Sequence, residues 1–244
     1  MSESKVSKIL IGCVTYDGHA KFIDEFLEHF SNLSSKADIV FAYNSFSEEY
    51  PDLLRSRGLN VIRDKPLEGD TRIGSIIRGR NRIREHFLQG YHDFLLFVDT
   101  DVMLPADAIE GLIECRSDVS SGIYLCNQEI KGKLQLIPTV YVPVGEGGSG
   151  RSGQARTVPI RDVIPKKIFD IMACGLGCAL ISRKVLEKIH FHRLEGSDSE
   201  TDKEDVAFCL DVRKEGFSMK ANSAVKCGHY IRIDGRDTLS LIKE

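Results

Sequence analysis

The chain has 244 residues, of which 42% are hydrophobic and 28% charged, and its formal net charge is -3. This composition is typical of a globular protein that can bury its own core. The near balance of 33 basic and 36 acidic residues argues against a nucleic-acid binder. No apolar run is long enough to cross a bilayer, so we expect no membrane-embedded segment. The seven cysteines lie mostly inside apolar runs, which predicts reduced thiols and a cytoplasmic location.

The first hundred residues alternate between strand and helix patterns. Strands are expected at 8–15, 39–43, 59–63 and 94–98, and helices at 22–33, 48–57 and 73–89. This alternation predicts an α/β fold with right-handed crossovers and a Rossmann-like, mostly parallel sheet flanked by helices. Ligands bind at the carboxyl ends of the strands in such sheets. The polar loops at 15–18, 44–47 and 99–101 are therefore the expected site.

The pattern becomes mixed after residue 101. Helices are expected at 105–115, 183–189 and 204–214, and strands at 119–125, 134–142, 179–182 and 225–231. Because helices no longer separate these strands regularly, we predict a mixed C-terminal half within a single domain, 1–244. The glycine-rich stretch 145–153 is either a solvated connector or a loop that orders when a ligand binds.

Two aspartates, Asp99 and Asp101, follow five consecutive apolar residues. If the extended conformation continues through Thr100, both carboxylates point to the same side. Carboxylates with room for water and phosphate oxygens suit Mg²⁺ or Mn²⁺. Aspartates also end strands and begin turns without any further role. The apolar run places this pair at the ligand-binding edge of the sheet, so we predict a metal site.

An arginine-rich segment precedes this pair. Guanidinium groups match phosphate oxygens in a bidentate manner, and a diphosphate needs only one or two of them. The others are expected on a solvated helix face. The five candidates are Arg72, Arg78, Arg80, Arg82 and Arg84.

Two late segments supply further candidates. Thr201 and Glu204 match a capping box at a helix start. If Glu204 caps the helix, Asp205 is left to point elsewhere, as a general base would. A lone histidine is usually structural, but His229 would complete a Mn²⁺ site if its neutral imidazole approached Asp101.

The order of these motifs resembles that of family 2 type glycosyltransferases with the GT-A fold, over roughly residues 8–232. The matching segments are Val14-Thr15-Tyr16-Asp17 on the first strand, Arg80-Asn81, Phe97-Val98-Asp99-Thr100-Asp101-Val102, the glycine-rich strand that begins Gly175-Leu176-Gly177, Glu204-Asp205 at a helix start, and His229.

The resemblance implies a metal-dependent transfer of a sugar from a nucleotide-diphosphate donor, a UDP- or GDP-sugar, to a hydroxyl of a glycan, lipid or protein. Residues 1–101 would form the nucleotide-sugar-binding half and residues 102–244 the acceptor-binding half. Asp99, Asp101 and His229 would hold Mn²⁺ or Mg²⁺, and Asp205 would act as general base in an inverting displacement. The implied donor-binding residues are Thr15, Tyr16, Asp17, Asn44, Arg72, Arg80, Asn81, Asp99 and Thr100.

Two other functions stay open. A sugar-1-phosphate nucleotidyltransferase usually carries a glycine-rich basic loop after the first strand, which residues 15–19 do not form. A nucleotide- or carbohydrate-binding module without turnover would share the fold, although Asp205 argues against it. Relatives often carry paired aspartates at the end of the second strand, where this chain has Tyr43-Asn44-Ser45. The resemblance therefore does not assign the nucleobase.

Overall fold

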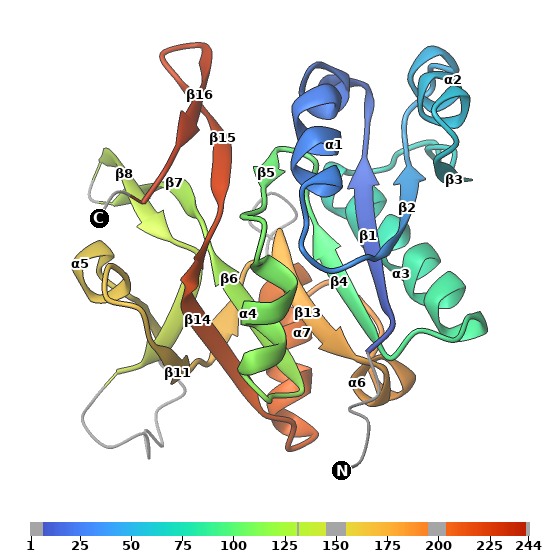
Figure 1. The fold of residues 1–244 in the computed structure, drawn as a ribbon. Helices are drawn as coiled ribbons and strands as arrows, with labels where there is room; N and C mark the ends of the chain where they lie inside the picture. Colours follow the sequence, from blue (N-terminus) through green and yellow to red (C-terminus); the bar gives the residue numbers. More distant parts are fainter. Residues whose placement is uncertain (1–6, 131, 145–154, 195–203, 243–244) are drawn as a thin grey trace.

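The computed structural model describes residues 7–130, 132–144, 155–194 and 204–242. Its first part follows the expected alternation of strands and helices (Figure 1). The elements are β1 (Ile9–Thr15), the 3-10 helix η1 (Asp17–Phe22), α1 (Ile23–Ser31), β2 (Asp38–Tyr43), α2 (Glu49–Ser56), β3 (Asn60–Arg63), α3 (Arg72–Gln89) and β4 (Phe94–Val98). The strands pair in the order β3-β2-β1-β4, all parallel. Figure 1 shows the arrowheads of β1, β2 and β4 pointing toward one edge of the sheet.

The second part completes the same sheet and adds smaller ones. Its elements are β5 (Val102–Met103), α4 (Ala108–Glu114), β6 (Val119–Ile123), β7 (Leu125–Ile130), β8 (Lys133–Pro138), β9 (Val140–Pro143), β10 (Ala155–Thr157), α5 (Ile160–Val163), β11 (Ile168–Asp170), β12 (Ala173–Cys174), β13 (Cys178–Ser182), α6 (Arg183–Lys188), α7 (Glu204–Lys214), β14 (Met219–Lys226), β15 (Gly228–Ile233) and β16 (Arg236–Ser240). The central sheet has eight strands in the order β11-β14-β6-β13-β4-β1-β2-β3. Four of its seven strand pairs are parallel, and β13 and β11 pair antiparallel with their neighbours. The predicted α/β class is confirmed.

Several predicted boundaries in this half are wrong, for a common reason. The runs expected at 119–125, 134–142 and 225–231 each contain parts of two strands, because each run passes from one sheet to another. β6 lies in the central sheet, whereas β7 pairs with β8 in another, and β14 is followed by β15 in a separate sheet. β16, the partner of β15, was not predicted, and the helix expected from Pro105 begins at Ala108.

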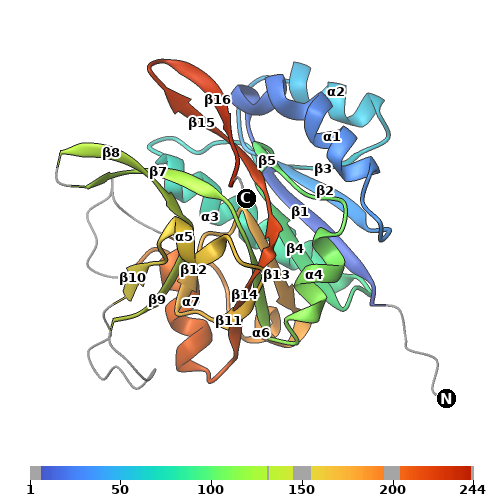
Figure 2. The same ribbon diagram turned by 60° about the vertical axis from the view of Figure 1, so that its left-hand side comes forward.

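Helices cover both faces of the central sheet, as the two views show (Figures 1 and 2). Successive residues of β1 point to opposite faces, so Leu10 and Val14 join one buried cluster and Ile11 and Cys13 the other. The first cluster includes side chains of α3, α6 and α7, and the second includes side chains of α1, α2 and α4. Among the described residues, no helix has the length and apolar character needed to cross a membrane.

Two glycines bring α3 close to β1. A Cβ atom at Gly12 of β1 would stand 2.5 Å from the side chain of Ile83, and one at Gly79 of α3 would stand 2.9 Å from Val14. Either substitution would push the helix away from the strand, since real Cβ atoms do not make contacts this short. The close approach places Arg80, the residue after Gly79, beside the carboxyl end of β4.

Candidate active site

A cavity of about 630 Å³ opens at the carboxyl ends of β1, β2 and β4. This volume lies in the range of small-molecule sites, and the position is the one that a parallel sheet favours for ligands. Nine predicted site residues line it, namely Thr15, Tyr16, Asn44, Arg72, Arg80, Asp99, Asp101, Asp205 and His229. Four carboxylates and two guanidinium groups face this one space, the carboxylates being those of Asp99, Asp101, Glu204 and Asp205. The excess of carboxylates suits a cation.

Arg80, Asp99 and Glu204 form a string of ion pairs on one side of the cavity, which we call the Arg80 cluster. Nη2 of Arg80 donates to Oδ1 of Asp99 at 3.3 Å, and Nε lies 3.4 Å from Oε1 of Glu204. The Arg80 side chain is 4% exposed, and its Nε and Nη1 have no hydrogen-bond acceptor among the described residues. Buried guanidinium groups are normally fully hydrogen-bonded. Since Nε already faces Glu204, Nη1 is the atom suited to a ligand oxygen.

Asp101, His19 and His229 form a second group, the Asp101 cluster. Nε2 of His19 lies 3.6 Å, and Nε2 of His229 3.7 Å, from the same carboxylate oxygen, Oδ2 of Asp101. Burial would raise the pKa of Asp101, but its interactions with the two histidines outweigh burial and lower that pKa. Burial lowers the pKa of His19, whereas the Asp101 carboxylate outweighs burial at His229 and raises its pKa. Sequence reasoning missed His19, which belongs to no recognisable motif.

The expectation that Asp99 and Asp101 share one side of an extended chain is wrong. The backbone turns after β4, and N–H of Val102 donates to the carbonyl of Asp99 at 2.9 Å. As a result, Asp99 faces Arg80 while Asp101 faces the two histidines. Both still line one cavity.

Three predicted donor-binding residues do not line the cavity: Asp17, Asn81 and Thr100. Asp17 accepts hydrogen bonds from the hydroxyls of Tyr43 and Ser45, so it joins the ends of β1 and β2. The Asn81 amide is paired in both directions with the backbone of Phe191, at 2.8 and 2.9 Å.

Thr100 is fully buried, and its hydroxyl lies 2.6 Å from Nδ1 of His19 and 3.2 Å from Oγ1 of Thr15. Because the Thr100 hydroxyl is hydrogen-bonded within the protein in this way, it has no free group to contact a nucleotide-sugar donor. Local sequence carries no signal for such pairings, because the partners are distant in the chain.

Two of the five arginines in this segment line the cavity, but the expectation that the other three lie on a solvated helix face holds only for Arg82. Arg72 and Arg80 line the cavity. Arg78 is ion-paired with Asp64 and Asp70, each at 2.6 Å, and Nε of Arg84 donates to backbone carbonyls of the α6 region at 2.7 and 2.8 Å. Arg82 is 53% exposed. Two of the five therefore remain for a diphosphate.

The far side of the cavity comes from the C-terminal half. The side chains of Cys126, Asn127, Gln128, Thr139 and Tyr141 line it, and none was predicted. Tyr124 lies in the same wall, where its hydroxyl accepts from N–H of Gly177 at 3.0 Å. A Cβ at Gly177 would stand 2.8 Å from that hydroxyl and 2.9 Å from Oδ2 of Asp99, so the glycine is needed for this fit.

Glu204 and Asp205 open α7, as predicted, and both line the cavity. The side chain of Glu204 pairs with Arg80 of α3. Thr201, its predicted capping partner, and the glycine-rich stretch 145–153 lie outside the described residues. The Glu204 pairing ties the start of α7 to α3, which keeps Asp205 at the cavity.

The donor atoms suit a divalent cation, although they do not enclose one. Among the described residues, no three His, Cys, Asp or Glu side chains converge closely enough to form a ready metal site. Asp101 nevertheless offers a carboxylate, and Nδ1 of His229 lies 2.6 Å from the carbonyl of Leu125. Because a carbonyl only accepts, that Nδ1 carries a proton, and in the neutral ring Nε2 then keeps its lone pair. Neutral imidazole and carboxylate are ligands that Mn²⁺ accepts.

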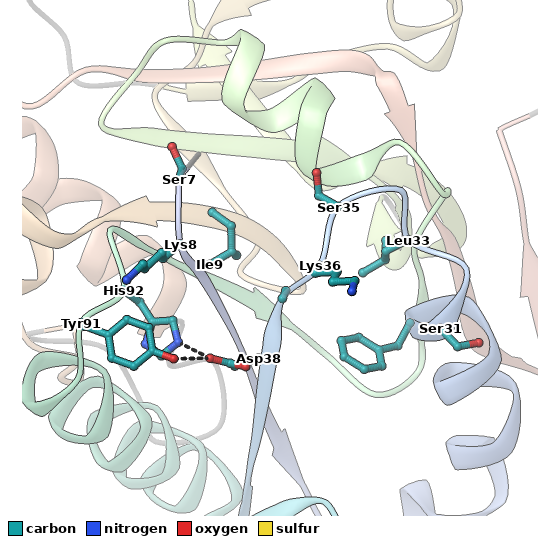
Figure 3. A pocket seen from close by; sticks show the side chains of 12 residues that line it. Ser7, Lys8, Ile9, Ser31, Leu33, Ser35, Lys36, Asp38, Tyr91 and His92 are labelled. Carbon is teal, nitrogen blue, oxygen red and sulfur yellow. Dashed lines mark hydrogen bonds and ion pairs between the residues drawn. The ribbon is translucent and has the colours of Figure 1, made fainter. Parts of the chain in front are cut away.

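A second cavity of about 630 Å³ lies at the opposite end of the sheet, near the starts of β1 and β2 (Figure 3). Its polar groups pair with one another: Asp38 accepts from Tyr91 at 3.2 Å and lies 2.8 Å from Nε2 of His92. Among the described residues that line it, Asp38 is the only one with a carboxylate and none is an arginine. The first cavity is therefore the candidate active site.

Comparison with known proteins supports the fold. No protein-family model and no curated protein sequence matches this chain. Among solved structures, S. aureus TarS 1-349 in complex with UDP-GlcNAc is similar over 94% of this chain and 60% of its own, with 16% identity and a TM-score of 0.54. Mannosyltransferase PcManGT from Pyrobaculum calidifontis, in complex with GDP-Man and Mn²⁺, is similar over 87% of this chain and 53% of its own, with 12% identity and a TM-score of 0.54.

This chain thus spans little more than half the length of those two proteins. Identities this low establish the fold alone, and membership of family 2 stays a prediction. The comparisons and the sheet topology together assign the chain to the GT-A fold, with the candidate site at the carboxyl edge of its parallel strands.

Proposed function

We propose that this chain is a metal-dependent glycosyltransferase that moves a sugar from a nucleoside diphosphate to an acceptor hydroxyl. The observation that carries the proposal is the convergence of four carboxylates and two arginines on one cavity. A nucleoside diphosphate is a polyanion, and it needs both a cation for its phosphates and donors for their oxygens. The structures with bound UDP-GlcNAc and GDP-Man support a nucleotide-sugar donor on this fold.

The donor would lie against the N-terminal half, 1–101. Tyr16 is 44% exposed beside the cavity and offers a ring face to a base, and Asn44 follows β2 at the same edge. Nη1 of Arg80, which has no hydrogen-bond acceptor among the described residues, would hold a diphosphate oxygen together with Arg72. A bound Mn²⁺ or Mg²⁺, held by Asp101 and His229 with Asp99 nearby, would offset negative charge on the leaving nucleoside diphosphate.

The acceptor would lie against residues 102–244, where Asn127, Gln128 and Tyr141 line the cavity. Asp205 would accept the proton of the acceptor hydroxyl as that oxygen attacks the anomeric carbon. The C–O bond to the diphosphate breaks in the same displacement, so the anomeric configuration inverts. Arg80 stays paired with Glu204, which neutralises the carboxylate next to the base.

Transfer assays test this function. We expect Asp205→Asn to lower the transfer rate by about 100-fold or more, the usual contribution of a general base. Binding of UDP or GDP, measured by calorimetry with Mn²⁺, should change less than about twofold. Wild-type transfer by Asp205→Asn would exclude Asp205 as the base. Pyrophosphate release from a nucleoside triphosphate would point to a nucleotidyltransferase, and nucleotide binding without turnover of any donor to a binding module.

A further inference from the structure

His19 occupies a position that its sequence context does not explain. It lies in the 3-10 helix η1, directly after β1, and its side chain is 15% exposed. Its ring lines the candidate active site, where Nε2 faces Oδ2 of Asp101 at 3.6 Å. His229, from the other end of the chain, faces the same oxygen at 3.7 Å. Two imidazoles from opposite ends of the chain thus approach one carboxylate oxygen.

Both rings are held by their other nitrogen. Nδ1 of His229 lies 2.6 Å from the carbonyl of Leu125, and Nδ1 of His19 lies 2.6 Å from the hydroxyl of Thr100. The Thr100 hydroxyl lies 3.2 Å from Oγ1 of Thr15, to which it can donate. When it donates there, it accepts from Nδ1 of His19, and the lone pair of the neutral ring is then on Nε2. Hydrogen bonds of this kind orient metal-binding histidines in proteins.

We propose that His19 is a third protein ligand of the metal ion, beside Asp101 and His229, and that Thr100 orients it. Donor atoms about 2.1 Å from one ion stand about 3–4 Å apart, and the two separations from Asp101 fall in that range. Because the three side chains do not enclose an ion as they stand among the described residues, we expect the imidazoles to rotate toward Asp101 when the metal binds. This inference rests on the proposed function only for the part that the ion plays in transfer. It also gives the buried Thr100 hydroxyl a role, that of orienting the His19 ring, in place of the predicted contact with the nucleotide-sugar donor.

The ligand set has a consequence for the choice of metal. Two imidazole nitrogens and one carboxylate favour Mn²⁺ and later transition metals, whereas Mg²⁺ prefers oxygen ligands throughout. We therefore expect the wild-type chain to bind Mn²⁺ more tightly than Mg²⁺. Replacing either histidine with glutamine substitutes an oxygen or amide donor for imidazole, which should reduce that preference.

The test is a titration of the full 244-residue chain with Mn²⁺ in the absence of nucleotide. The EPR signal of free Mn²⁺ reports how much of the ion is unbound, and Mg²⁺ is added as competitor in a second series. We expect His19→Gln and His229→Gln each to weaken Mn²⁺ binding by about tenfold or more, since even the loss of groups that only orient ligands has that effect. Thr100→Val should weaken it by about tenfold. His190→Gln is the matched control, because His190 is exposed and does not line the cavity. Thermal unfolding checks that each variant is folded.

Pulsed EPR of the Mn²⁺-loaded protein adds a direct readout. Coupling to imidazole nitrogen should correspond to two histidines in the wild type and to one in either variant. If His229→Gln loses Mn²⁺ while His19→Gln binds it as the His190→Gln control does, with the same nitrogen coupling as the wild type, the His19 proposal is wrong and the proposed function stands. If Mn²⁺ binds through both histidines but no nucleotide sugar is turned over or bound, the ligand set stands and the proposed function fails.

Discussion

The two clusters of the candidate active site are built from similar residues but differ in how their charges are balanced. In the Arg80 cluster a buried guanidinium lies between two carboxylates, at 3.3 and 3.4 Å. In the Asp101 cluster two imidazoles face one carboxylate at 3.6 and 3.7 Å, beyond normal hydrogen-bond length. The ion pairs of the first cluster therefore contribute to the stability of the fold in addition to the proposed contact of Arg80 with the diphosphate, whereas the second cluster is arranged for a ligand alone. Substitutions in each should separate these roles.

The largest effect is expected for Arg80→Met. The substitution leaves Asp99 and Glu204 without their shared partner in a partly buried site, and loss of one partner of a buried pair typically costs about 3–5 kcal/mol. Because Asp99 is 33% exposed, we expect the lower end, about 3 kcal/mol, in the free energy of unfolding measured with urea. Arg80→Lys keeps the charge and should lose less. A loss below about 1 kcal/mol for Arg80→Met would show that the ion pairs are not structural.

Asp101→Asn should affect metal binding strongly and the free energy of unfolding weakly, the reverse of what we expect for Arg80→Met. We expect the affinity for Mn²⁺ to fall by about 100-fold or more, because the amide replaces the carboxylate that both histidines face. The free energy of unfolding without metal should fall by less than in Arg80→Met, since the histidine nitrogens lie 3.6 and 3.7 Å from Oδ2, beyond normal hydrogen-bond length. Equal losses of stability in Asp101→Asn and Arg80→Met would remove the distinction between the clusters.

Gly177→Ala tests the packing beside the Arg80 cluster. The new Cβ would press on Tyr124 and Asp99 at 2.8 and 2.9 Å, and overpacking of this kind typically costs about 1–3 kcal/mol. We expect a loss of about 2 kcal/mol in urea unfolding, together with weaker binding of UDP or GDP in calorimetry. Combining it with Tyr124→Phe removes the hydroxyl oxygen, one of three atoms that would lie within 3 Å of the new Cβ, and should restore part of the stability. No restoration would mean that the clashes with the Tyr124 ring carbon and with Asp99 dominate.

The smallest effect is expected outside both clusters, at the start of α3. The Thr71 hydroxyl accepts from N–H of Gly74 at 3.1 Å, so it caps the helix that carries Arg80. Thr71→Ala should lower the free energy of unfolding by about 1 kcal/mol, the usual value of an N-cap. Mn²⁺ affinity in the EPR titration should match that of the wild type. A metal-binding defect would show that the helix start also positions the Asp101 cluster.

Local sequence patterns predicted much of the fold. The alternation of apolar runs located β1, β2, β3 and β4 with the helices between them to within a few residues, because each run serves a single strand or helix. The same reasoning failed where one run serves two sheets, as between β6 and β7 and between β14 and β15. Hydrophobicity records burial, and it does not record which sheet a buried residue joins.

Patterns along the chain predicted the class of fold, the edge of the sheet that carries the candidate site, and nine residues that line its cavity. The partners of those residues follow from the tertiary structure and were not predicted. In the folded chain Asp99 faces Arg80, whereas Asp101 faces His19 and His229. Asn81 and Asp17 form hydrogen bonds to other residues of the protein and do not line the cavity. The physical reason is distance along the chain: a motif specifies which groups lie at a strand end, but the partner of each group comes from segments tens to hundreds of residues away.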